Sequence, residues 1–296
     1  MIQFPTPGIT RLQGDVFRKG GVEVDMLRLD LLHPEIQGNK YYKLKYNLER
    51  ARKEGFSTLL TYGGPWSNHL YATAAAGKLA GFNTIGVVRG MHHETPTLAF
   101  AVAQGMLLVR TTREEYAGRT SPSFQEKLKE TYGPYYLIPE GGSNLEGTRG
   151  AMEILPRGQY DIVCCACGTG TTLAGLALSA SHGTRIFGFS PFAGHSGLLH
   201  DVDEKMREID PEADVSGVSI IEGYHFGGFG KWSDELIRFM DHFEKSEKIA
   251  LDLVYTSKMM YGLSAMIAGG SIADGCRVLA VHTGGLQGNA GRNHGD

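Results

Sequence analysis

One glycine- and threonine-rich segment has the composition of an anion-binding loop. It follows the apolar run 161–165 and precedes an apolar helical pattern over 171–179. Backbone N–H groups at a helix N-terminus, together with threonine hydroxyls, favour phosphate. The third glycine and later acidic residue of a dinucleotide site are missing, as is the Gly-Lys-Ser/Thr of a triphosphate loop. A ligand with a single phosphate, or a tight turn without a ligand, remains. The residues are Gly168, Thr169, Gly170, Thr171 and Thr172.

A lysine at the predicted start of a helix is the candidate nucleophile. Lys40 follows a Gly-Asn turn and precedes Lys43 and Lys45. Two neighbouring cations and the positive end of a helix both lower the pKa of an amine. An amine with a lowered pKa is a better nucleophile for Schiff-base formation. Lys40 is therefore either an ordinary solvated helix residue or a Schiff-base nucleophile.

Short apolar runs alternate along the chain with helical patterns. This alternation predicts βαβ units, and therefore an α/β protein with a mostly parallel sheet that positions these residues. In such sheets ligands bind at the carboxyl ends of strands. The charged, proline-bearing segments 113–123 and 201–214 are predicted to be surface connections. Strands are predicted at 57–62, 84–88, 106–109, 135–138, 161–165, 185–189 and 277–281, and helices at 41–54, 67–80, 97–104, 144–155, 171–179, 233–243 and 258–268.

Composition limits the class of protein. The 296 residues suggest about two domains. The net charge of −3 argues against a nucleic-acid partner. The chain shows no signal-peptide pattern and no apolar stretch long enough for a bilayer, so we expect no membrane partner and a cytoplasmic location. Cys164, Cys165 and Cys167 are expected to be reduced, buried hydrophobic residues, and no metal site is expected.

Five motifs occur in order through nearly the whole chain. They are Gly38-Asn39-Lys40 with Lys43-Leu44, Gly63-Gly64 with Ser67-Asn68-His69, Gly168 to Thr172 with Ala174-Gly175, Val254-Tyr255-Thr256 with Lys258 and Gly262, and His282-Thr283-Gly284-Gly285. Each motif is weak alone. The ordered set resembles the 1-aminocyclopropane-1-carboxylate deaminase and D-cysteine desulfhydrase family, among the pyridoxal-phosphate enzymes of the tryptophan synthase β type.

The resemblance implies a two-domain fold of type II, in which each domain is an open, mostly parallel sheet covered by helices. A larger domain that binds pyridoxal 5′-phosphate would comprise residues 1–53 plus 139–296. A smaller domain, residues 54–138, would be inserted into it. The cofactor would lie between the domains, and enzymes of this group are usually homodimers.

The resemblance also implies a role for each site residue. Lys40 would form the Schiff base with the cofactor, and Asn68 would hydrogen-bond the ring hydroxyl. Ser67 would contact the substrate carboxylate and act as a nucleophile or in proton transfer. Tyr255 would lie against the cofactor ring, and Thr256 would hydrogen-bond the pyridine nitrogen. The loop Gly168, Thr169, Gly170, Thr171 and Thr172 would hold the phosphate.

Four positions depart from the deaminases that open the cyclopropane ring. Thr256 replaces a glutamate that keeps the pyridine nitrogen protonated, and Phe229 falls where a second tyrosine is expected. Trp66 and His69 alter the surroundings of Ser67, which changes the expected substrate pocket.

These departures favour β-elimination from a small amino-acid substrate, D-cysteine first, giving pyruvate, ammonia and sulfide. One alternative is a 1-aminocyclopropane-1-carboxylate deaminase that gives 2-oxobutanoate and ammonia. Another is a non-catalytic protein that binds the cofactor or an amino acid.

Overall fold

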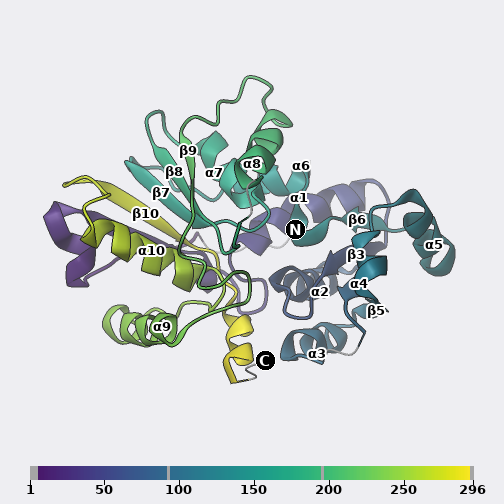
Figure 1. Ribbon diagram of the computed structural model, residues 1–296. Helices are drawn as coiled ribbons and strands as arrows, with labels where there is room; N and C mark the ends of the chain where they lie inside the picture. Colours follow the sequence, from purple (N-terminus) through teal and green to yellow (C-terminus); the bar gives the residue numbers. More distant parts are fainter. Residues whose placement is uncertain (1–5, 92–93, 195–196, 294–296) are drawn as a thin grey trace.

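Two sheets organise the part of the chain that the computed structural model describes, residues 6–91, 94–194 and 197–293 (Figure 1). The larger has the order β1-β2-β10-β7-β8-β9 and the smaller the order β5-β4-β3-β6. Only β1 runs antiparallel to its neighbour; the other pairs of described strands are parallel. The strands are β1 Ile9–Arg11, β2 Glu23–Arg28, β3 Thr58–Gly63, β4 Asn83–Arg89, β5 Leu107–Thr111, β6 Tyr136–Ile138, β7 Ile162–Ala166, β8 Arg185–Phe189, β9 Val218–Ile221 and β10 Arg277–His282.

Helices cover both faces of each sheet, as parallel strands require. The α-helices are α1 Asn39–Lys53, α2 Asn68–Ala80, α3 Pro96–Ala103, α4 Arg113–Ala117, α5 Pro122–Tyr132, α6 Leu145–Ala151, α7 Thr171–Ser179, α8 Leu198–Arg207, α9 Asp234–Glu247 and α10 Thr256–Ala268. Short 3₁₀ helices are η1 Asp15–Gly21, η2 Leu29–Leu31, η3 Glu140–Gly142 and η4 Leu286–Asn293.

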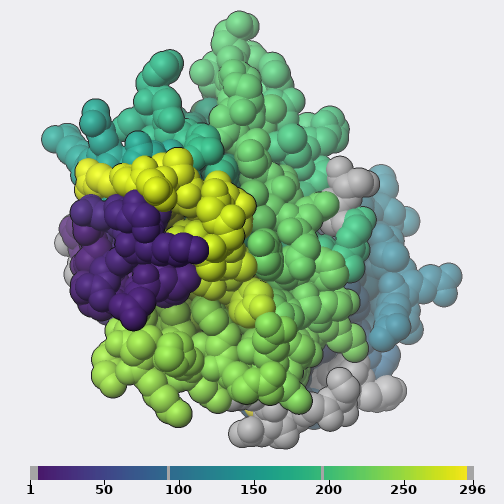
Figure 2. Space-filling model, turned by 60° about the vertical axis from the view of Figure 1, so that its left-hand side comes forward, coloured from purple at the N-terminus to yellow at the C-terminus, as the bar shows by residue number. Residues whose placement is uncertain are grey.

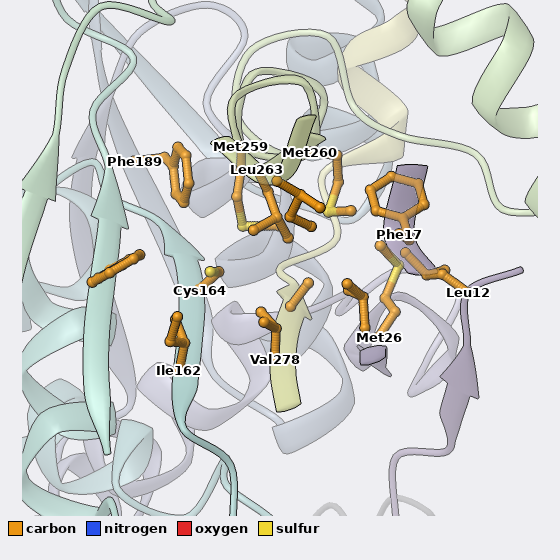
Figure 3. Packing of buried hydrophobic residues seen from close by; sticks show 14 of the residues in the cluster. Leu12, Phe17, Met26, Ile162, Cys164, Phe189, Met259, Met260, Leu263 and Val278 are labelled. Carbon is orange, nitrogen blue, oxygen red and sulfur yellow. The ribbon is translucent and has the colours of Figure 1, made fainter. Parts of the chain in front are cut away.

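The core of the larger sheet has two layers. On one face, α10 and η1 pack on the strands through Met259, Leu263 and Phe17, with Cys164 of β7 and Val278 of β10 beneath them (Figure 3). On the other face, α6, α7 and α8 cover the alternate strand residues. Because successive strand side chains point to opposite faces, neighbouring residues of β7 belong to different layers.

The smaller sheet is covered by α1 and α2 on one face and by α4 and α5 on the other. Leu59 of β3 packs against Leu44 and Ala76, whereas its neighbour Leu60 packs with Tyr116 and Leu128. The helix α3 adds a further cluster with α2 and β4. The four strands lie within residues 58–138. The predicted fold class is confirmed, and the boundaries 54 and 138 stay a prediction.

The two ends of the described chain lie side by side in the larger sheet. β10 pairs with β2 from Arg277–Glu23 to His282–Arg28, and with β7 on its other side. Figure 2 shows the N-terminal segment in purple directly beside the yellow C-terminal segment. Residues from both ends of the sequence therefore meet at the carboxyl edge of this sheet.

Both segments that we predicted to be connections contain helices. In 201–214, the first part belongs to α8, which buries Leu198, Val202 and Met206 at helical spacing. In 113–123, α4 begins with a capping box between Thr112 and Glu115. The strands β1, β2 and β9 were not predicted either. Dense charge hid the apolar positions of each helix, so the prediction was wrong there.

No helix among the described residues is both long and apolar enough to cross a membrane. The first five residues, part of the segment searched for a signal peptide, lie outside the described residues.

Candidate active site

Lys40 is fixed by an unusually close backbone approach just before α1. Gly38 has φ +67°, and a Cβ atom there would lie 1.7 Å from the carbonyl oxygen of Thr283. The side-chain amide of Asn39 donates to Thr172 Oγ1 over 2.8 Å. The start of α1 thus touches both the loop after β10 and the glycine-threonine loop after β7. This contact brings the predicted lysine to the predicted anion site.

The amine of Lys40 is easier to deprotonate than a free lysine. Burial disfavours its charged form and lowers its pKa to about 8, although Cys165 and Asp252 act in the opposite direction. Its Nζ donates to Asn39 Oδ1 over 2.9 Å. The sequence predicted a lowered pKa from the charges of Lys43 and Lys45. The direction is confirmed, but the main cause is burial, and Lys45 pairs instead with Glu153.

The loop from Gly168 to Thr172 has an open helix N-terminus. Gly170, with φ +78°, is the N-cap of α7, and no side chain caps the helix there. The hydroxyls of Thr169 and Thr171 lie 3.0 Å apart, and that of Thr171 donates to Ser143 Oγ over 3.0 Å. A helix N-terminus lined with hydroxyls provides donors for an anion.

Lys43 completes this anion site, and the sequence analysis treated it only as a neighbouring charge. Its side chain is 3% exposed, and Nζ lies 3.0 Å from the carbonyl oxygen of Gly141 and 3.4 Å from Thr169 Oγ1. Burial, reinforced by the charge of Lys40, holds the pKa of Lys43 well below its usual value. A buried cation beside hydroxyl donors suits a dianion. The i, i+3 spacing from Lys40 was the available signal.

The start of α2 forms the opposite side of the site. Ser67 is the N-cap of this helix, and its Oγ accepts from the backbone N–H of Leu70 over 3.2 Å. Asn68 Oδ1 accepts from Gln287 Nε2 over 2.6 Å. Asn68 also lies against Gly285, where a Cβ atom would be 2.5 Å from its Nδ2. Asn68 therefore faces the loop after β10.

His69 is a buried neutral histidine in the same helix turn. Thr61 Oγ1 donates to the carbonyl oxygen of Ile138 over 2.7 Å and must therefore accept from His69 Nε2–H, 2.9 Å away. Burial, with the charges of Lys40 and Lys43, holds the pKa of His69 well below its usual value. The histidine lies close enough to both lysines for its protonation to oppose theirs.

The start of α10 is organised by a carboxylate that the sequence analysis did not single out. Asp252, only 2% exposed, accepts from the backbone N–H groups of Val254, Tyr255 and Thr256 at 2.7–3.0 Å. Thr256 Oγ1 donates to Asp252 Oδ1 over 2.7 Å and accepts from the backbone N–H of Asp252 over 2.8 Å. The Thr256 hydrogen is thus already used, and only an oxygen lone pair remains for a further donor.

Tyr255 borders the anion loop and carries an aromatic wall. A Cβ atom on Gly168 would lie 3.4 Å from its ring. Phe229 meets the ring of Tyr255 edge-on, with centroids 5.9 Å apart, and stacks on Phe192. Lys258 Nζ donates to the carbonyl oxygens of His225 and Gly228, each over 2.8 Å, and so holds the segment that leads into Phe229. Burial raises the pKa of Tyr255, so its hydroxyl stays protonated.

The cysteines near the site are structural. Cys164 and Cys165 lie in β7, Cys167 follows it, and all are free and buried, as predicted. Burial raises the pKa of each thiol, to about 12 for Cys167. Among the residues that the structure describes, no group of three or more His, Cys, Asp or Glu side chains is placed to hold a metal ion.

These contacts bring five separated segments to one place. Asn39 joins α1 to the anion loop, Gly168 meets Tyr255, and Asn68 meets Gly285. One site is therefore bordered by Lys40, by the candidate anion loop with Lys43, and by the ring of Tyr255. Such a site fits a phosphorylated aldehyde that reacts with an amine and is held by its phosphate.

Comparison with known proteins identifies the class. Residues 15–284 match the family model described as "Pyridoxal-phosphate dependent enzyme". The protein is thus a pyridoxal-phosphate-dependent enzyme of fold type II. More narrowly, it belongs to the 1-aminocyclopropane-1-carboxylate deaminase and D-cysteine desulfhydrase family.

Relatives support that narrower placement. A Pyrococcus horikoshii protein named "Putative 1-aminocyclopropane-1-carboxylate deaminase" is 30% identical over 93% of this chain and 88% of its own length. An Arabidopsis thaliana protein named "Bifunctional D-cysteine desulfhydrase/1-aminocyclopropane-1-carboxylate deaminase, mitochondrial" is 29% identical over 90% of this chain and 73% of its own length.

Solved structures agree on the fold. A structure described as that of an "ACC deaminase homologue" superposes with a TM-score of 0.83 at 28% identity, over 96% of this chain and 90% of the other. A cystathionine beta-synthase from Helicobacter pylori superposes with a TM-score of 0.68 at 15% identity, over 96% of this chain and 94% of the other. The latter shows the fold alone.

Proposed function

We propose that the protein removes the β-substituent of a small amino acid. The proposed substrate is D-cysteine, from which the protein would release pyruvate, ammonia and sulfide. The observation that carries this proposal is the hydrogen bond from Asn39, the residue before Lys40, to Thr172 of the loop from Gly168 to Thr172. This contact supports the proposal because the amine of lowered pKa follows directly after a residue bonded to the candidate phosphate loop. The bifunctional plant relative supports the substrate class.

The residues present fit pyridoxal 5′-phosphate. The N–H groups at the start of α7, the Thr169 and Thr171 hydroxyls and the Lys43 ammonium would hold the phosphate dianion. Lys40 would bind the aldehyde carbon, and Asn68 would hydrogen-bond the ring hydroxyl. When bound, the cofactor supplies an electron sink that weakens bonds at the substrate's α-carbon.

The protein's own groups would then handle the protons. Lys40, once free, would act as the base for the α-proton, because its pKa of about 8 lies near neutral pH. Ser67, at the N-terminus of α2, would meet the substrate carboxylate, which suits the positive end of that helix. Tyr255 would pack against the ring from the side of Gly168.

Two residues favour β-elimination over ring opening. Thr256 offers a neutral hydroxyl in place of the carboxylate that would favour a protonated pyridine nitrogen. Phe229 packs on Tyr255 but offers no hydroxyl for proton transfer. Both positions lack a group that ring opening would use. Neither change affects removal of the α-proton by Lys40.

Opening of the cyclopropane ring is the second candidate, because the name of the Pyrococcus horikoshii relative favours it. The two reactions give different products. D-Cysteine would yield sulfide and pyruvate, and 1-aminocyclopropane-1-carboxylate would yield 2-oxobutanoate. Incubating the purified protein with each compound and measuring both keto acids separates them. A cofactor absorbance that shifts with an amino acid but gives no keto acid would favour a non-catalytic binder.

The test of the site is the Lys40→Ala variant with Lys45→Ala as its matched control. Lys45 lies on the same helix, but its amine pairs with Glu153 at the surface. We expect Lys40→Ala to lose at least about a thousandfold in turnover and to lose the covalent cofactor absorbance, and Lys45→Ala to keep both. Equal activity in the two variants would refute the assignment. The proposal also includes a homodimer, which analytical ultracentrifugation tests, and a cytoplasmic location, which cell fractionation tests.

A further inference from the structure

A cavity beside Lys40 contains polar atoms that the proposed function leaves unexplained. Its volume is about 10 Å³, enough for one water-sized molecule. The side chains that line it include Lys40 and Gln37, which are three residues apart, and Gln287 of η4.

Two of these side chains present an acceptor without a donor. Among the described residues, Gln37 Oε1 and Gln287 Oε1 are buried atoms that have no hydrogen-bond partner. The amide orientations are set by the other end of each group, because Gln37 Nε2 donates to Pro34 O over 2.9 Å and Gln287 Nε2 donates to Asn68 Oδ1 over 2.6 Å. A buried acceptor left unpaired is costly, so two of them on residues that line one cavity indicate a missing donor.

Lys40 can supply that donor. A lysine ammonium has three N–H groups, and one is already directed to Asn39 Oδ1 over 2.9 Å. Gln37 Oε1 and Gln287 Oε1 would accept the other two.

We propose that this cavity receives the Lys40 ammonium when the lysine is free of the cofactor, and that Gln37 and Gln287 are the positioning residues that hold it. The proposal rests on the proposed function, in which Lys40 takes the α-proton. In that step the C–H bond breaks, its electron pair stays on the substrate, and a new N–H bond forms on Lys40. The two amide oxygens stabilise the resulting ammonium close to the reacting carbon and make the free lysine a stronger base.

The test measures the pKa of Lys40 directly in the full-length protein without cofactor. The protein is labelled with lysine carrying ¹³C at the ε-carbon, and the Lys40 signal is assigned by its absence in Lys40→Met. We expect Gln37→Met and Gln287→Met each to lower the pKa of Lys40 by about one unit, through loss of one charge-assisted hydrogen bond. Gln37→Glu should raise it, because it adds a negative charge.

Gln13→Met is the control, because Gln13 is exposed and its side-chain amide donates to Arg11 O, two residues away, rather than to a residue of the cavity. An unchanged Lys40 pKa in all three cavity variants would mean that the cavity holds water alone, and would overturn the proposal. The outcome is separable from the proposed function. If the pKa shifts as expected while Lys40→Ala keeps full turnover, the acceptors stand and the catalytic role of Lys40 fails; the reverse pattern overturns the acceptors alone.

Discussion

Lys43→Met should change stability and cofactor affinity in opposite directions. Lys43 is a buried cation whose polar contacts are a carbonyl oxygen and a hydroxyl. Without an anion, its charge opposes folding, because burial and the charge of Lys40 disfavour the ammonium. Methionine has a similar length and no charge. The substitution therefore removes a cost from the cofactor-free protein and a ligand from the phosphate site.

The size of each effect follows from the contacts. Replacing buried charge by a well-packed apolar group stabilises a fold by about 1–4 kcal/mol, and losing the bond to Gly141 O costs about 1 kcal/mol. We expect the free energy of unfolding of the cofactor-free protein to rise by about 1 kcal/mol. A charge-assisted bond to phosphate is worth about 2–3 kcal/mol. The dissociation constant for pyridoxal 5′-phosphate should then rise about 30- to 150-fold.

Urea unfolding of the cofactor-free protein and absorbance titration with the cofactor measure the two quantities. Pyridoxal, which lacks the phosphate, is the matched ligand, and its affinity should stay unchanged. Equal loss of affinity for both ligands would show that Lys43 acts elsewhere, and a destabilised cofactor-free variant would refute the electrostatic reasoning.

The pH dependence supplies an independent check on Lys43. Its folded pKa is depressed, so between that value and about 10.5 the unfolded chain binds more protons, and stability rises with pH. Lys43→Met should lose part of this rise. The remainder comes from Lys40 and Lys258, whose pKa values burial lowers to about 8.

Two further predictions concern His69 and Gly38. The pKa of His69 is lowered in the folded protein, so the wild type should lose stability as pH falls below about 6.5. In His69→Gln, the urea midpoint should depend less on pH between about pH 5 and 6.5. Parallel curves of midpoint against pH for the two proteins would contradict this. Gly38→Ala would place a Cβ atom 1.7 Å from Thr283 O and should cost at least about 3 kcal/mol in urea unfolding, whereas Gly55→Ala, also at positive φ but with open space around it, should cost about 1 kcal/mol. Similar costs at the two glycines would argue against the close approach.

Much of the fold was accessible from the sequence because parallel strands are buried on both faces and appear as continuous apolar runs. The helix predicted at 171–179 matches α7, and the strand predicted at 185–189 matches β8. The helix α8 was not predicted, because its three buried residues are separated by acidic and basic side chains. The strand β2 was not predicted, because its apolar residues alternate with charged ones.

The candidate site was accessible to the extent that it consists of loops at strand ends. Lys40 and Asn68 line one cavity and Tyr255 lies against Gly168, whereas the roles assigned to these residues stay a prediction. The role of Asp252 was not accessible, because a carboxylate that caps a helix resembles any polar turn residue. Gln37 and Gln287 were not accessible either, since they meet only through backbone contacts between distant parts of the chain.

The central place of β10 in the larger sheet has a consequence for synthesis on the ribosome. The strands of the smaller sheet are complete once residue 138 has emerged, whereas β2 and β7 wait for residues 277–282 to separate them. At about 5–20 residues per second, that interval is on the order of 10 s. During it, the nascent chain carries two unpaired apolar strand edges, which invite aggregation. The same order of emergence assembles the cofactor site last, so a truncated product that lacks β10 would be both inactive and exposed to chaperones and proteases.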